Sequence, residues 1–154
     1  MKFLCDDNLG KLARYLRMLG YDTYFEQTIG DAELLSVMLK QGRIVLTRDS
    51  NLVERIESER RLLIESDSPE KQLKAVITQL NLQINKDKLF TRCLECNKVC
   101  SEVAGEDVTD EVFPYIIKTQ DSFKRCPKCR RIYWQGSHYK DMIAKLKSVI
   151  EGLD

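Results

Sequence analysis

The first 88 residues alternate between short apolar runs and helical patterns, and this alternation restricts the fold more than any other feature of the sequence. Runs rich in aromatic and β-branched residues are typical of strands, whereas apolar residues three and four positions apart are typical of amphipathic helices. The pattern predicts strands at residues 3–5, 21–25, 43–47 and 62–64, and helices at 9–19, 31–39, 50–59 and 68–80. Strands that alternate with helices over short turns favour a parallel sheet covered by helices.

The character of the sequence changes after residue 88. An acidic segment at 106–111 and strand-like runs at 115–117 and 132–134 precede a helical pattern at 142–153. We therefore expect two parts, an α/β domain at residues 1–88 and a smaller module at residues 89–154.

The cysteines of this second part form two C-x-x-C pairs, CLEC and CPKC. Each pair places two thiolates on one tight turn, and two facing turns complete a tetrahedral site with no position for water. Ordinary buried cysteines or disulfides are the alternative. Cys100 has no second partner in register, and Cys5 lies in a predicted strand as a small core residue. The sequence therefore predicts a zinc ribbon with structural Zn²⁺ bound by Cys93, Cys96, Cys126 and Cys129.

Basic residues surround the second cysteine pair, and aromatic residues follow it. Cations beside aromatic rings suit the phosphates and bases of single-stranded nucleic acid. Alternatively, the cations balance the charge of a four-thiolate zinc site and the tryptophan is packing. The candidate RNA-binding residues here are Lys124, Arg125, Lys128, Arg130, Arg131 and Trp134.

A second basic stripe, Lys11, Arg14 and Arg17, recurs every three residues along the first predicted helix. These cations could guide an RNA backbone, although a solvated helix face is the simpler interpretation.

Acidic residues recur where the predicted strands end. The carboxyl ends of parallel strands share one edge of a sheet, and ligands bind there. Carboxylates gathered at that edge repel one another unless a cation joins them, and Mg²⁺ or Mn²⁺ is the natural cation for oxygen ligands. The candidate acids are Asp6 and Asp7 after the first strand, Asp31 and Glu33 at the second helix, Asp49 after the third strand and Asp67 after the fourth.

Each acid also has a purely structural interpretation. Asp31, Asp49 and Asp67 could cap the helices that follow them, because aspartate is favoured at that position. The adjacent pair Asp6 and Asp7 is harder to explain in this way, since one cap needs one side chain. The metal hypothesis therefore depends on convergence of the acids.

Three folds place acids at such strand ends. A phosphoacceptor receiver domain needs a fifth strand ending in lysine, which the sequence lacks. A haloacid-dehalogenase phosphatase needs D-x-D after its first strand, where this chain has D-D-N. A metal-dependent nuclease of the PIN type remains.

Four stretches together resemble a known family: KFLCDDNLGKLARYLRMLGYDT at residues 2–23, GRIVLTRD at 42–49, the CLEC and CPKC pairs, and IYWQGSHY at 132–139. They resemble the PIN-like RNase family named after the C-terminal domain of the worm Mut-seven exonuclease, which pairs a PIN-like domain with a zinc ribbon. The resemblance implies that Asp6 is the first catalytic acid, Asp31 or Glu33 the second and Asp49 the third. Asp7 stands where such families often have glutamate, and Asp67 is added from its strand position alone.

The resulting prediction is a metal-dependent ribonuclease that hydrolyses RNA with Mg²⁺ or Mn²⁺ and contacts RNA through its zinc ribbon. The alternative is a non-catalytic RNA-binding or ribosome-associated zinc-ribbon protein. His138 is the single histidine, which excludes a paired-histidine mechanism, and its own role stays open.

Composition adds little to the functional prediction. The net charge is only +1, so any nucleic-acid surface must come from local clustering. No apolar run has the length of a signal peptide or a membrane span, so we expect a cytoplasmic protein without a membrane partner. The oligomeric state is left open.

Overall fold

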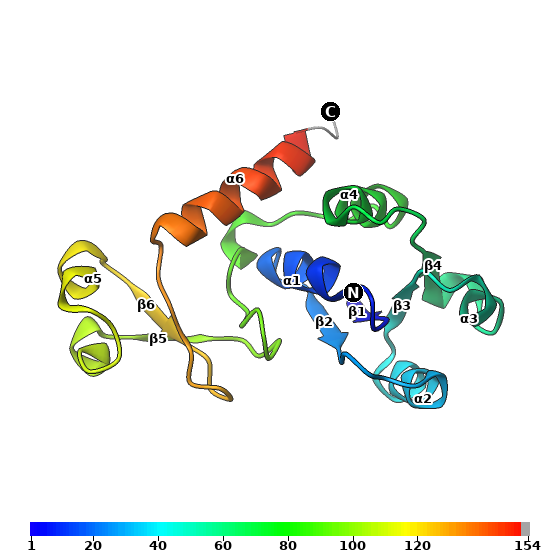
Figure 1. Ribbon diagram of the computed structural model, residues 1–154, viewed down its shortest axis with the longest axis horizontal. Coiled ribbons are helices and arrows are strands. Elements are labelled where there is room, and N and C mark those ends of the chain that lie inside the picture. Colours follow the sequence, from blue (N-terminus) through cyan, green and yellow to red (C-terminus); the bar gives the residue numbers. More distant parts are fainter. Residues whose placement is uncertain (152–154) are drawn as a thin grey trace.

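The computed structural model describes residues 1–151 and contains a parallel sheet followed by a small antiparallel sheet (Figure 1). The parallel sheet has the strand order β2-β1-β3-β4, as the alternating pattern predicts. Its strands are β1 (Lys2–Cys5), β2 (Asp22–Phe25), β3 (Ile44–Thr47) and β4 (Arg61–Leu63). The helices between and after them are α1 (Gly10–Met18), α2 (Asp31–Gln41), α3 (Ser50–Glu54) and α4 (Pro69–Gln79).

Helices cover both faces of this sheet. Phe3 and Cys5 of β1 pack in one core cluster with α1 and α4, whereas Leu4, between them, packs in a second cluster with α2 and α3. Successive side chains of a strand point to opposite faces, so a strand buried on both faces must be apolar throughout. This explains the continuous apolar runs of β1 and β3.

The third helix is shorter than the predicted span of 50–59. It ends at Glu54, and a 3₁₀ turn, η1 (Ser58–Arg60), precedes β4. The amides of Arg55 and Ile56 bond to carbonyls three residues earlier, at Leu52 and Val53, so the last turn tightens and the helix stops.

The second sheet is antiparallel, with the order β5-β6-β7. Its strands are β5 (Ser101–Val103), β6 (Phe123–Arg125) and β7 (Ile132–Tyr133), and an insertion between β5 and β6 contains η3 (Gly105–Val108) and α5 (Pro114–Thr119).

The predicted strand at 115–117 is wrong, because these residues lie in α5. Pro114 occupies the first helical position, where its fixed φ favours a helix, and Phe113 before it is extended. Three consecutive apolar residues carry no periodicity that separates strand from helix.

A long C-terminal helix, α6 (Ser137–Glu151), returns to the parallel-sheet part and packs against α4. Leu146 and Val149 join the core cluster of α1 and α4. The helix begins five residues before the predicted start at 142, and the predicted end at residue 153 lies outside the described residues. Residues from the first strand and from the last helix therefore share one hydrophobic core.

The connection between the two parts is also tightly packed. It contains η2 (Lys86–Lys88), and a Cβ placed on Gly20 would lie 2.5 Å from the carbonyl oxygen of Lys88. Gly20 also has a φ of +87°, so both its backbone conformation and this close approach require glycine. Among residues 1–151, no helix is long and apolar enough to cross a membrane.

Candidate metal centres

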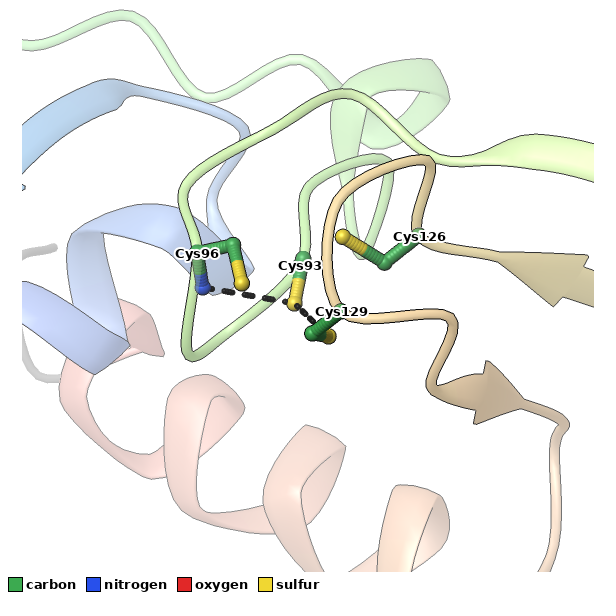
Figure 2. A group of neighbouring side chains, drawn as sticks. All are labelled: Cys93, Cys96, Cys126 and Cys129. Carbon is green, nitrogen blue, oxygen red and sulfur yellow. Dashed lines mark hydrogen bonds between the residues drawn. The ribbon is translucent and has the colours of Figure 1, made fainter.

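The four predicted zinc ligands come together at the tips of two facing turns (Figure 2). Their sulfur atoms all lie within 4.8 Å of one another, and the Cys93 and Cys129 sulfurs are 3.7 Å apart. A tetrahedral Zn²⁺ with bonds of about 2.3 Å would hold its sulfurs about 3.8 Å apart. The donor set and the spacing therefore fit a structural zinc ion.

The two turns have the same backbone shape. The amide of Asn97 bonds to the carbonyl of Cys93, and the amide of Arg130 bonds to the carbonyl of Cys126. Asn97 and Arg130, each directly after the second cysteine of its pair, have φ values of 62° and 65°. Each turn therefore has a left-handed residue at the same position, directly after its second cysteine. In both turns the two sulfurs face the centre of the cluster.

Tyr133 of β7 supports the first pair from outside the cluster. Its hydroxyl oxygen accepts a hydrogen bond from the Leu94 amide at 3.1 Å and lies 3.1 Å from the Cys93 sulfur. When Cys93 is a thiolate, the hydroxyl donates its proton to that sulfur. Burial alone would raise the pKa of Cys93, but bonds from Tyr133 and from the amides of Cys96 and Glu95 lower it to about 7. This environment favours the thiolate that zinc requires.

Arg17 fastens the first cysteine turn to the parallel-sheet part. Its side chain is 4% exposed and donates to the carbonyl oxygens of Thr23, Leu94 and Glu95, at 3.0, 2.6 and 3.1 Å. Burial lowers the pKa of this guanidinium. The expected basic stripe therefore does not extend to Arg17, because its donors are used inside the protein.

A second attachment runs through Asn97 and the edge strand β2. The Asn97 side chain accepts from the Thr23 amide at 2.9 Å and donates to Asp22 at 2.7 Å. Asp22 also accepts from the buried Arg43 at 2.8 Å. The first cysteine turn is thus built into the edge of the parallel sheet.

The acids at the carboxyl edge of that sheet centre on Thr47, the last residue of β3. The fully buried Thr47 hydroxyl donates to the Asp6 carboxylate at 2.7 Å and accepts from the Asp49 amide at 3.0 Å. The other Asp6 oxygen accepts from the Asp7 amide at 2.8 Å. One buried hydroxyl therefore links the ends of β1 and β3.

The capping interpretation holds for only one of the acids. Asp49 caps α3, with one carboxylate oxygen accepting from the amides of Asn51 and Leu52. Ser68, not Asp67, caps α4, and Gly30, not Asp31, occupies the cap position of α2. Asp6 caps no helix, because α1 begins without a side-chain cap.

The remaining candidate acids lie apart from the Thr47 link. Asp31 pairs with Arg55 at 2.8 Å, and Glu33 is exposed in the first turn of α2. Asp7 and Asp67 line a hollow of about 560 Å³ together with Lys11 and Arg14. Among the described residues, the four cysteines are the only set of three or more cysteine, histidine or carboxylate side chains whose ligand atoms all lie within 4.8 Å.

The acid edge still provides the hard oxygen ligands that a divalent cation prefers. Mg²⁺ in proteins is often bound through one or two carboxylates while it keeps several waters. Asp6 and Asp49 would be those ligands, since the Thr47 hydroxyl bonds both the Asp6 carboxylate and the Asp49 backbone amide.

The basic residues of the ribbon divide into paired and exposed groups. Arg125 bonds to Glu111 at 2.6 Å and to the Asp107 carbonyl, which ties it to the insertion. Lys128 and Arg130 are exposed, and Arg131 lies 3.9 Å from Glu95. Lys124, Trp134 and His138 line a hollow of about 660 Å³ beside the ribbon.

Two contributing residues were missed by the sequence analysis. The sequence analysis assigned Thr47 only to a buried strand. Its position two residues before Asp49 is the signal in the sequence that could have indicated its role. Glu95, between two zinc ligands, pairs with Arg14 across the two parts of the chain. No local sequence pattern predicts the Arg14–Glu95 contact.

A family model and a human protein are similar to this chain. The family model described as the Mut7-C RNAse domain matches residues 1–146. The human protein "Exonuclease mut-7 homolog" is 32% identical over 104 residues, which cover 62% of this chain and 12% of that protein. The chain thus spans a small part of that relative's length. No solved structure matches significantly. From the family match over nearly its whole length, the chain belongs to the Mut7-C RNase domain family.

Proposed function

We propose that this chain is a metal-dependent ribonuclease whose active site lies at the carboxyl edge of the parallel sheet. Membership in an RNase family supports a nuclease with RNA as its substrate. The observation that supports this location is the Thr47 hydroxyl, which donates to the Asp6 carboxylate at 2.7 Å and accepts from the Asp49 backbone amide at 3.0 Å. It fixes the orientation of the Asp6 carboxylate next to the start of α3, and carboxylates that bind a metal are commonly held by such hydrogen bonds.

Asp6 and Asp49 would hold Mg²⁺ or Mn²⁺, with Asp31 as the third acid from α2. Such an ion supplies an activated water and neutralises charge that develops on the phosphate. Thr47 keeps the Asp6 carboxylate in one orientation. The backbone amides at the start of α3 donate to one carboxylate oxygen of Asp49, so its other oxygen is available to bind the metal ion.

Basic residues would position the RNA. Lys11 and Arg14 line the hollow beside Asp7, where they can neutralise phosphates of the bound strand. Lys128 and Arg130 of the ribbon are exposed and would extend this contact. Zn²⁺ would have a structural role, because its four thiolate ligands leave no open position.

A non-catalytic RNA-binding protein is the second candidate. It is favoured by the separation of the acids, since no three carboxylates of the described residues meet within 4.8 Å. In that case the ribbon would carry the function.

Cleavage of a labelled single-stranded RNA decides between these functions. The zinc-loaded chain should cleave with Mn²⁺ or Mg²⁺, and Asp6→Asn and Asp49→Asn should each reduce the rate at least about 100-fold. Asp87→Asn is the matched control, because this exposed acid of η2 lies outside the acid edge. Unchanged cleavage in both site variants would identify a contaminating nuclease. RNA binding without cleavage by the wild type would establish the second candidate.

A further inference from the structure

A hollow lies beside the zinc ribbon and away from the acids. It is lined by residues of α5, β7, the start of α6 and Arg14 of α1, and its volume is about 660 Å³. This falls within the range of about 300–1,000 Å³ that is typical of ligand sites. The hollow is therefore large enough for more than one nucleotide, and the proposed acid chemistry does not use it.

Aromatic rings line this hollow from three segments. Tyr115 of α5 is 72% exposed, and Trp134 and Tyr139 are half-buried. Trp134 packs on Phe123, and a Cβ at Gly136 would lie 2.8 Å from the indole nitrogen, so this ring is held closely from behind. Tyr139 stacks obliquely on Phe90 with ring centroids 4.5 Å apart. Rings that are fixed and partly open can stack on unpaired bases.

The charge of the lining suits a polyanion. Five basic residues, Arg14, Arg92, Lys124, Arg131 and Lys140, contribute to it, whereas Glu95 is its single acid. Glu95 pairs with Arg14 and Arg131, and Arg92 donates to backbone carbonyls. Lys124 and Lys140 make no ion pair in the part of the chain that the structure describes. The ammonium groups of Lys124 and Lys140 are therefore available to bind phosphates.

This hollow adjoins the second hollow, which is lined by Asp7 and Asp67. Arg14, Leu94 and Glu95 line both, and the second also includes Lys11. A strand that left the first hollow would cross the Arg14–Glu95 pair and reach Asp7, the neighbour of Asp6 in the chain. The first cysteine turn, which carries Glu95, thus forms the boundary between the two hollows.

We propose that the hollow beside the ribbon binds unpaired nucleotides of an RNA strand, with bases against Tyr115 and Trp134 and phosphates at Lys124 and Lys140. This inference rests on the proposed ribonuclease function and assigns single-stranded RNA as its substrate class. Duplex RNA is excluded because its bases are stacked on one another and cannot lie against these rings.

Trp134 is the only tryptophan, so its fluorescence reports directly on the hollow. We would titrate the zinc-loaded Asp6→Asn chain with a single-stranded oligoribonucleotide and with a duplex of the same sequence. The single strand should quench Trp134, and the duplex should quench it far less. Adding Tyr115→Ala should weaken the affinity at least about fivefold, since a base loses its stacking partner. Adding Phe113→Ala should leave the affinity unchanged, because Phe113 is 81% exposed and does not line the hollow.

A second measurement concerns the phosphates. Replacing Lys124 and Lys140 together by alanine should reduce the slope of log affinity against log salt by about 1.4, the value for two contacts with a single strand. Zinc content and circular dichroism establish that each variant is folded.

Three results would overturn the proposal: absence of quenching, equal quenching by the duplex, or equal effects of Tyr115→Ala and Phe113→Ala. Cleavage by the wild type without quenching would reject this hollow and leave the nuclease assignment intact. Quenching without cleavage by the wild type would support the hollow and reject the nuclease.

Discussion

The cysteine cluster and the acid edge differ in how their ligands are brought together. The four cysteines come from two local turns, and the sulfurs of all four lie within 4.8 Å (Figure 2). The acids come from separate ends of strands and helices, and the three proposed as catalytic are each engaged by a neighbour. Arg55 holds Asp31, the α3 amides hold Asp49, and Thr47 holds Asp6.

The difference teaches which kind of site can be built from a sequence motif. In a C-x-x-C turn, spacing alone fixes the separation of two ligands, so only the meeting of two turns depends on the fold. At a sheet edge, every ligand depends on strand order, register and local partners. A motif therefore defines the first site, and only a structure defines the second.

Loss of zinc should have the largest effect. Cys126→Ser removes a buried ligand, so we expect less than about 0.1 zinc per chain and destabilisation by more than about 5 kcal/mol. The unfolding should include the parallel sheet, because the first cysteine turn is attached to it. Metal analysis and thermal denaturation measure both effects. Cys100→Ser is the control and should keep about one zinc, since Cys100 is outside the cluster.

Arg17→Met tests the attachment itself. It leaves the carbonyls of Leu94 and Glu95 without their buried donor, so the free energy of unfolding should fall by about 3 kcal/mol. Denaturant unfolding measures this change. Unchanged stability together with a large loss of RNA affinity would instead restore the role in RNA binding that was expected from the sequence.

Thr47→Val tests whether the acid edge is an organised site. The shape is kept while the hydroxyl that joins Asp6 and Asp49 is lost, so cleavage should fall about 10- to 100-fold. Thr23→Val is the matched control, because Thr23 is equally buried but lies in the edge strand β2, away from the acids. If both variants cleave RNA equally well, the acids are independent of Thr47.

Asp22→Asn should have the smallest effect, and the effect should depend on pH. Burial alone would raise the pKa of Asp22, but hydrogen bonds from Arg43 and Asn97 outweigh it and lower the pKa. The charged form therefore stabilises the fold above the unfolded-state pKa of about 3.9, and this contribution is lost as pH falls through the lower folded-state value.

The substitution should cost about 1 kcal/mol at pH 7, and this cost should shrink as the pH falls through the folded-state pKa. Unfolding titrations at several pH values give this difference. A cost that stays constant with pH would mean that the hydrogen-bond geometry, and not the charge, is responsible.

The parallel sheet was predictable because its inner strands β1 and β3 are buried on both faces and its helices carry apolar stripes. The insertion between β5 and β6 was less predictable. Ile116 and its neighbours form a helix where a strand was expected, because Pro114 occupies the first helical position. Among the site residues, the cysteine cluster follows from spacing. The burial of Arg17 and the Asn97–Asp22 contact do not, because they depend on how the two parts pack.

The attachment of the first cysteine turn also affects the order in which the protein assembles. Arg17, Asp22 and Thr23, which hold this turn, all precede it in the chain, so the turn can dock as soon as the sheet has formed. We infer that Cys93 and Cys96 are then in place before Cys126 and Cys129. Binding of zinc to all four cysteines would bring the second turn to the first and close the loop of residues 97–125. Closing a loop of this length costs conformational entropy, which the binding of zinc offsets. The metal therefore joins the second turn to a turn that the sheet already holds, and through this turn its loss destabilises the parallel sheet as well.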